Sequence, residues 1–198
     1  RQLLLPRQTS GIRRQIDRRD EPVIASQYEL VVADDHLAYD VMKTRIARYA
    51  TRTYDWDALK FQADFDPKYR RAQMRYLGTG GTGIDADGNT VPSEHFTFST
   101  MVLPPGCEGP LHVHHDVEEV FFMLRGKVKL FFEKDGDKWE AVLGERDLVS
   151  VPPGIYRGLV NDHDEEALMC VMLGSPKPTI PTYPPDHPLA KIDRSKKN

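Results

Sequence analysis

The sequence has few cysteines, no long hydrophobic run and no large excess of charge. Two cysteines among 198 residues are too few for a disulfide framework and are typical of a reducing compartment. No apolar stretch approaches the roughly 20 residues that span a bilayer, and the start lacks the apolar core of a signal peptide. We therefore expect a cytoplasmic protein that does not associate with membranes.

The charge of the chain gives no overall reason to bind nucleic acid. The formal net charge is −3 at pH 7, which favours neither a nucleic-acid backbone nor an anionic lipid surface. Six arginines make the first twenty residues locally basic. A solvated arm, or a segment that contacts a protein partner, is a simpler interpretation of that run than nucleic-acid binding.

A change in hydrophobic period divides the chain into three parts. Residues 1–71 are mixed: a strand-like run at 28–32 is followed by two short helical patterns, the second ended by Pro67. Residues 72–174 contain six to eight short runs rich in Val, Phe, Leu and Tyr, with period two and turn signals between them. Residues 175–198 contain six of the fifteen prolines, which predicts an extended tail without a core of its own.

The length of the chain allows one well-packed domain with extensions. Short strands at this spacing predict an all-β sandwich or barrel over residues 72–174. We expect residues 1–71 to pack on this barrel as an extension. The run at 28–32 is predicted to add a strand to the barrel or to the sheet of a partner, which would give a homodimer.

A histidine cluster lies in the stretch GCEGPLHVHHDVEEVFFMLRG, residues 106–126. His112 and His114 are two residues apart, so on a strand both imidazoles point to the same face. Glu119 follows on the next strand-like run. Two imidazoles and one carboxylate are the ligand set of a facial triad that suits Fe, Mn, Ni or Zn. The spacing alone fits a solvated histidine-rich turn equally well, but the apolar run after Glu119 favours the metal site.

This stretch resembles the first motif of the cupin superfamily. The pattern is Gly-x5-His-x-His-x4-Glu-x6-Gly, and every fixed position is occupied, from Gly106 to Gly126. The resemblance implies a jelly-roll barrel, or double-stranded β-helix, of two facing antiparallel sheets, often dimeric. It also implies one divalent metal inside, held by His112, His114 and Glu119. Iron is the metal that we expect first.

A second stretch, RDLVSVPPGIYRGLVN, resembles the second cupin motif with two departures. Pro152, Gly154 and Asn161 fit that motif. Arg146 stands where the family usually has glycine, and Arg157 stands where the family usually has its last metal-binding histidine. The resemblance covers about residues 94–173, so the N-terminal third and the tail lie outside it.

Arg157 allows three arrangements, because a guanidinium stays protonated and has no lone pair for a metal. In the first, Arg157 binds a carboxylate, enolate or phosphate of a substrate that also reaches the metal. In the second, it pairs with Glu119 or Glu118, and the barrel binds a small acid or sugar with little or no metal. In the third, its side chain leaves the cavity, and His95 or a water completes the metal shell.

The alternation of apolar residues predicts the lining of the cavity. His95 shares a strand face with Thr97 and Ser99 if the strand begins early enough; the alternative is that it lies at a strand end in solvent. Phe121 and Met123 should follow Glu119 into the interior. The same register predicts further inward-facing residues at Val128, Leu130, Phe132 and Leu159.

These residues predict an enzyme, with two alternatives. The leading hypothesis is a non-haem iron dioxygenase that acts on a small anionic or phenolic substrate, with Arg157 orienting the negative group. The first alternative is a non-catalytic barrel that binds a small acid or sugar. The second is a metal-dependent isomerase or lyase that consumes no oxygen.

Overall fold

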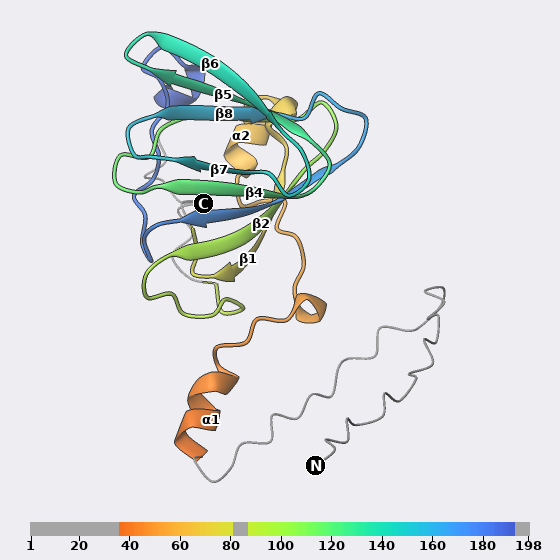
Figure 1. Ribbon diagram of the computed structural model, residues 1–198, viewed down its shortest axis with the longest axis vertical. Coiled ribbons are helices and arrows are strands. Elements are labelled where there is room, and N and C mark those ends of the chain that lie inside the picture. The colour runs from red at the N-terminus through yellow and green to blue at the C-terminus, as the bar shows by residue number, and fades with distance from the viewer. Residues whose placement is uncertain (1–35, 81–86, 193–198) are drawn as a thin grey trace, which may run out of the picture. The chain divides into compact units, whose positions relative to one another are not determined.

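The computed structural model describes residues 36–80 and 87–192, and in these ranges nine strands form two antiparallel sheets (Figure 1). The first sheet has five strands in the order β1-β2-β9-β4-β7, and the second has four in the order β3-β8-β5-β6. The strands of the first sheet are β1 (Ala72–Leu77), β2 (Thr97–Leu103), β9 (Ala167–Leu173), β4 (Glu119–Arg125) and β7 (Leu148–Val151). Those of the second are β3 (Glu108–His112), β8 (Tyr156–Val160), β5 (Val128–Lys134) and β6 (Asp137–Leu143).

This architecture confirms the all-β prediction. All the strand pairings are antiparallel, and the chain passes repeatedly from one sheet to the other, as in a jelly roll. The run expected at residues 28–32 lies outside the described residues. None of the helices in the described residues is long and apolar enough to cross a membrane.

The core lies between the two sheets and follows the predicted register. Phe121 and Met123 of β4 are buried, and they pack with the inward-facing residues of β5 and β8. Those residues are Val128, Leu130, Phe132 and Leu159. Burial of a side chain of this size contributes roughly 1.5–3 kcal/mol, so this cluster is the main source of stability of the barrel.

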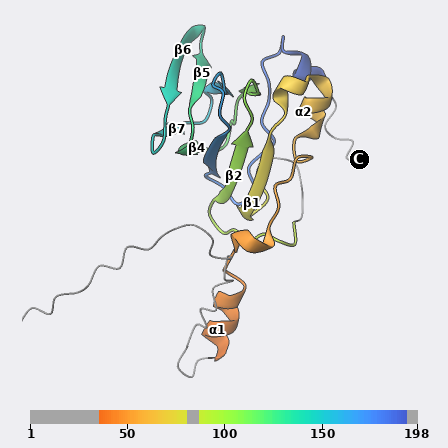
Figure 2. The same cartoon turned by 90° about the vertical axis from the view of Figure 1, so that its right-hand side faces the viewer.

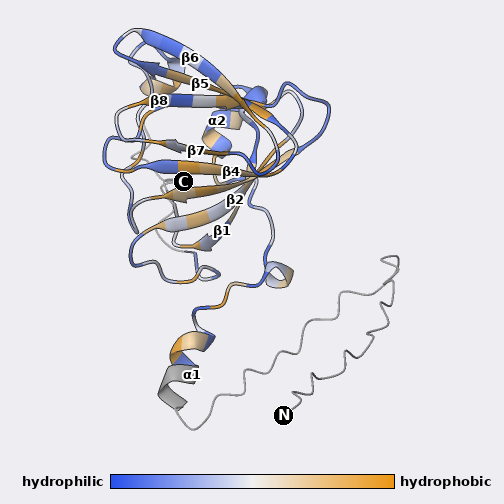
Figure 3. Ribbon diagram, viewed as in Figure 1, coloured by the Kyte–Doolittle hydropathy of each residue, from blue (hydrophilic) through white to orange (hydrophobic). Residues whose placement is uncertain are grey.

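The edge strand β6 differs from the core strands. Most of its residues are exposed, and Figure 3 shows hydrophilic residues along much of its length. Charged side chains on an edge strand oppose pairing with another sheet. The strand shows the period-two pattern only at its end, where Ala141 is partly buried, Val142 is exposed and Leu143 is buried against the core.

The parts that flank the barrel in sequence contain short helices, and the second helix and the tail pack together. The helices are α1 (His36–Lys43), η1 (Tyr49–Thr51), α2 (Lys60–Phe65), η2 (Pro67–Tyr69) and η3 (Pro188–Lys191). Tyr69, Tyr183 and Leu189 form a second buried cluster, with Phe61 and Ile192 at its border. Figure 2 shows α2 on the side of the molecule where β1 lies. The tail is therefore largely extended, as predicted, but it shares a small core with α2 and η2.

Candidate metal centre

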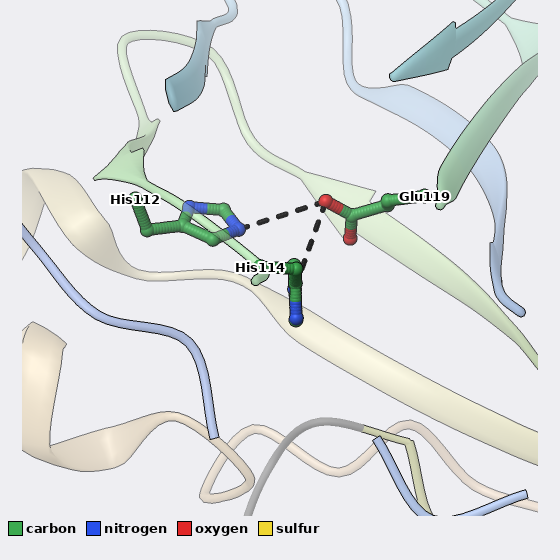
Figure 4. A group of neighbouring side chains, drawn as sticks. All are labelled: His112, His114 and Glu119. Atoms are coloured by element: carbon green, nitrogen blue, oxygen red, sulfur yellow. Dashed lines mark ion pairs between the residues drawn. The ribbon is translucent and has the colours of Figure 1, made fainter. Parts of the chain in front are cut away.

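Three side chains that the sequence singled out come together between the two sheets. His112 ends β3, His114 follows in the next loop, and Glu119 begins β4 (Figure 4). One ligand atom from each lies within 4.8 Å of the others. His112 Nε2 is 3.6 Å and His114 Nε2 is 3.9 Å from the same oxygen, Glu119 Oε2. Residues from two strands of different sheets thus converge on one point.

The backbone around His112 fixes which of its nitrogens can bind a metal. His112 Nδ1 lies 2.8 Å from the carbonyl oxygen of Pro110. A carbonyl can only accept a hydrogen bond, so Nδ1 carries the proton and Nε2 keeps its lone pair. That free nitrogen is the atom that faces Glu119. The local structure therefore holds the tautomer that a metal ligand requires.

The loop that contains His114 is held by two other segments. The amide of Gly154 donates to the carbonyl of His114 at 2.8 Å, and Val113 and Thr182 exchange backbone hydrogen bonds of 2.8 and 3.0 Å. The loop is thus supported on one side by the proline-rich tail and on the other by the second motif. Rigid support of this kind keeps a ligand side chain in one orientation.

The protonation states at the site suit a metal. Burial lowers the pKa of His114 to about 4, so this imidazole is neutral at pH 7. Burial by itself would raise the pKa of Glu119, but the neighbouring side chains of His112, His114 and Arg157 lower it to about 2. The site therefore offers the neutral imidazole of His114 and an ionised carboxylate, which are the forms in which these groups bind a divalent ion.

The donor set fits a divalent metal. Metal–ligand bonds of about 2.0–2.2 Å place neighbouring ligand atoms roughly 3–3.5 Å apart, and the two N···O distances above exceed this by a few tenths of an ångström. Glu119 Oε2 is buried and has no hydrogen-bond partner among the described residues. A small rotation of each side chain would bring the three atoms to bonding distance of one ion.

Arg157 lies against this cluster rather than in the cavity. It is directly opposite His112 in the β3–β8 pairing, and its side chain is 0% exposed. Its Nε is 2.9 Å from Glu119 Oε2, an ion pair that is not aligned as a hydrogen bond, while its Nη1 donates to the carbonyl of Ile155 at 3.0 Å. Of the three arrangements considered for Arg157, this contact is the pairing with Glu119.

The second motif keeps its structural asparagine. Asn161 is fully buried, and its side-chain amide donates to the carbonyls of Leu103 and Glu165 at 3.0 and 2.8 Å. Its backbone exchanges hydrogen bonds with Gly106 and Cys107 at 2.8 and 2.9 Å. Asn161 therefore joins the end of β8 to the start of the first motif, and this function does not depend on the residue at position 157.

A cavity of about 70 Å³ adjoins the three candidate ligands. This is room for a few waters or a small organic acid. Its apolar wall includes Phe121, Leu159 and Val171, whereas Met123 is buried in the core and does not line it. Its polar wall comes from elements outside the two motifs. The polar residues are Gln62, Arg71, Gln73, Thr97 and Ser99.

Two residues lie differently from what the sequence suggested. His95 is exposed, and it does not line the cavity, because β2 begins only at Thr97. Arg71 lines the cavity and was not singled out, because it precedes β1 and belongs to no motif. The alternation of Arg71 with Gln73 in a strand-like run was the one available signal. The pattern did not reveal which face of that run is the inner one.

A comparison with protein families supports the fold, because residues 99–173 match the family model described as a cupin domain. No curated protein matches the chain. Among solved structures, an oxalate oxidase shares 20% identity over 42% of this chain and 43% of its own, with a TM-score of 0.40. The oxalate decarboxylase of Lactobacillus farciminis shares 17% identity over 44% of this chain and 26% of its own, with a TM-score of 0.42.

A variant of the oxalate decarboxylase of Bacillus subtilis is also similar. It shares 17% identity over 55% of this chain and 27% of its own, with a TM-score of 0.46. The Bacillus subtilis enzyme has Mn(II) centres. The chain thus spans less than half the length of the oxalate oxidase and about a quarter of the length of the decarboxylases. Matches at this level do not identify an activity.

Proposed function

Residues 99–173 of this chain form a cupin domain, and from this premise we propose that the protein is a metal-dependent enzyme. The reaction class that we propose is that of a non-haem iron dioxygenase acting on a small anionic or phenolic substrate. The observation that carries this proposal is the convergence of His112, His114 and Glu119 within 4.8 Å beside a cavity. When bound, iron supplies the one-electron and oxygen chemistry that amino-acid side chains lack.

The residues of the chain prepare the site in three ways. The hydrogen bond from His112 Nδ1 to Pro110 leaves Nε2 as a donor atom. Arg157 lies 2.9 Å from Glu119 and helps to keep that carboxylate ionised. The apolar wall that contains Phe121 and Val171 limits the access of water, which suits oxidation better than hydrolysis.

The alternative function is a non-catalytic barrel that binds a small acid or sugar and holds metal weakly or not at all. The observation that favours it is the ion pair between Arg157 and Glu119, because a guanidinium beside a carboxylate competes with a metal for the same oxygen. A third function, a metal-dependent isomerase or lyase, uses the same ligands without oxygen.

Metal content tests the proposal directly. After reconstitution with Fe(II), Mn(II), Ni(II) or Zn(II) and desalting, elemental analysis should find close to one ion per chain in the wild type. The His112→Ala variant should lose it, while His95→Ala should retain it, because His95 is exposed and lies outside the cavity. Metal that is absent from the wild type but gained by Arg157→His would establish the binding barrel instead.

Oxygen dependence then separates the two enzyme classes. Turnover of a screened acid or phenol that requires air, with oxygen uptake at an electrode, would support the dioxygenase. Turnover at an equal rate without oxygen would overturn it in favour of the isomerase or lyase.

A further inference from the structure

Arg71 is a buried cation at the cavity, and no carboxylate of the described residues pairs with it. It directly precedes β1, it is 6% exposed, and it lines the cavity beside the candidate ligands. Its Nη1 donates to the carbonyl of Tyr69 at 3.0 Å. Among the residues that the structure describes, no aspartate or glutamate forms an ion pair with Arg71. One neutral carbonyl is a weak counterpart for a fully ionised side chain.

The two buried arginines of the site therefore differ in their surroundings. Arg157 contacts Glu119 at 2.9 Å. Glu119 influences Arg71 only by electrostatic attraction without direct contact. Burial is the largest influence on Arg71 and lowers its pKa to about 10, which shows that nearby negative charge does not offset desolvation. An arginine still carries its proton at pH 7 under these conditions. A buried charge of this kind is costly unless an anion reaches it.

A neighbouring side chain adds a second requirement. Gln62 of α2 is 4% exposed and lines the same cavity. Its Nε2 donates to the hydroxyl of Tyr183, but its Oε1 has no hydrogen-bond partner among the described residues. A buried amide oxygen without a partner is unfavourable, so the cavity also suits a ligand that carries a hydrogen-bond donor.

We propose that Arg71 binds the carboxylate of a small hydroxy acid in this cavity, and that Gln62 accepts a hydrogen bond from the hydroxyl group. The guanidinium offers planar paired donors that match a carboxylate, and the volume of about 70 Å³ limits the ligand to a few carbon atoms. The substrate class rests on the proposed function, since the same cavity adjoins the candidate metal ligands, but binding of the acid needs no metal.

The charge balance supports an anionic ligand. Among the described residues at the cavity and the adjoining cluster, Arg71 and Arg157 are cations and Glu119 is an anion, so these three side chains together carry a net charge of about +1. A divalent ion would add two further positive charges. A small monocarboxylate would reduce this excess in either state, and a neutral ligand would not.

The test is an NMR titration of the ¹⁵N-labelled full chain with lactate, with lactamide as the uncharged analogue and propionate as the analogue without the hydroxyl. The titration is done on metal-free and on Zn(II)-treated protein. Lactate should bind more tightly than either analogue. Arg71→Met should weaken lactate roughly 10- to 100-fold, the loss of a charged hydrogen bond, and leave lactamide unchanged. Gln62→Leu should bring lactate down to the affinity of propionate.

Matched variants make each outcome decisive. Arg70→Met removes an exposed neighbouring arginine and should leave lactate binding unchanged. Arg71→Lys keeps the charge without the paired donors and should bind lactate with intermediate affinity, and thermal unfolding followed by circular dichroism checks that both Arg71 variants fold. Wild-type affinity in Arg71→Met, no binding of lactate by the wild type, or loss of lactate binding only in Arg157→Met would each overturn the proposal.

The metal proposal fails separately. If the metal-free protein binds lactate through Arg71 but retains none of Fe(II), Mn(II), Ni(II) and Zn(II) after reconstitution, the carboxylate site stands and the enzyme proposal falls. If zinc is retained but Arg71→Met binds lactate normally, the metal centre stands and the assignment of Arg71 falls.

Discussion

The two motif regions of the barrel differ in which features of the cupin motifs they contain. Residues 106–126 keep every ligand position of the first motif, and the structure brings those ligands together. Residues 146–161 keep the backbone connections of the second motif, through Gly154 and Asn161. At the position where an imidazole is usual, they present Arg157. The hydrogen-bonding framework and the chemistry of the site can therefore change independently.

The second motif contacts the first mainly through atoms that do not depend on the side chain at position 157. The second motif supports the first through main-chain groups and one amide, as in the hydrogen bond from Gly154 to the carbonyl of His114. The side chain at position 157 points between the sheets, where it meets Glu119. A guanidinium there preserves the pairing of β3 with β8 while it replaces a ligand with a fixed positive charge.

The largest effect should come from breaking the contact that joins the two regions. Arg157→Met leaves Glu119 buried without its cation, and we expect a loss of about 3–5 kcal/mol in the free energy of unfolding. The double variant with Glu119→Gln should lose less than the sum of the two single variants. Urea unfolding of the metal-free protein followed by circular dichroism measures this.

An exposed ion pair provides the control. Arg125 and Glu166 are 2.8 Å apart, but their side chains are 57% and 43% exposed. Arg125→Met should therefore cost less than about 1 kcal/mol. Strictly additive effects of the Arg157 and Glu119 substitutions would show that the buried pair does not couple the two regions.

A smaller loss in the free energy of unfolding is expected at acid pH, and it should come from His114 in the first motif region. Burial lowers the pKa of His114 from 6.5 to about 4, so between these values the unfolded chain takes up a proton that the folded chain does not. The contribution of His114 to the free energy of unfolding is therefore fully present above pH 6.5. It falls by about 3 kcal/mol as the pH drops toward 4. Glu119, whose pKa is lowered to about 2, adds a further loss below pH 4.5.

Unfolding of the metal-free protein between pH 4 and 8 tests this acid limb. His114→Gln should flatten the curve between pH 6.5 and 4.5, and His95→Gln should not, because His95 is exposed. No histidine occurs within residues 146–161, so the second region should contribute nothing to this pH range. An unchanged limb in His114→Gln would mean that another group titrates there.

The sequence predicted the barrel and the candidate metal ligands because both predictions depend on local patterns. The period of two identified the inward-facing residues from Phe121 to Leu159. The fixed spacing of the first motif pointed to His112, His114 and Glu119, which the structure brings together. Arg71, Gln62 and the contact of the tail with Val113 were not predicted. They depend on how segments distant in sequence pack, and no spacing rule connects residue 62 or 71 with residue 119.

The contact of Arg157 with Glu119 could not be predicted from the sequence for a similar reason. The sequence placed this arginine at the site but left three arrangements open, because the choice depends on where the carboxylate of Glu119 lies. That position is set by the pairing of β4 with β7 and β9. Neither pairing can be read from the two motifs alone.

The smallest effect concerns Arg146, the other departure in the second region. Its φ is +69°, whereas Gly126, the closing glycine of the first motif, has a φ of +76°. The left-handed conformation costs a residue with a Cβ roughly 1–2 kcal/mol, and Arg146→Gly would remove this strain. The higher entropy of glycine in the unfolded chain offsets part of the resulting stabilisation. Arg146→Gly should therefore stabilise the protein by up to about 1 kcal/mol.

The matched substitution in the first region should act in the opposite direction. A Cβ at Gly126 would lie 3.0 Å from the carbonyl oxygen of Glu166 and 3.2 Å from Ala167 Cα, so Gly126→Ala adds a steric clash to the backbone strain. Arg146 is exposed, and its replacement removes no buried contact. Urea midpoints of the two variants measure the difference, and a destabilised Arg146→Gly would show that the arginine side chain supports the second region in a way that its backbone conformation does not explain.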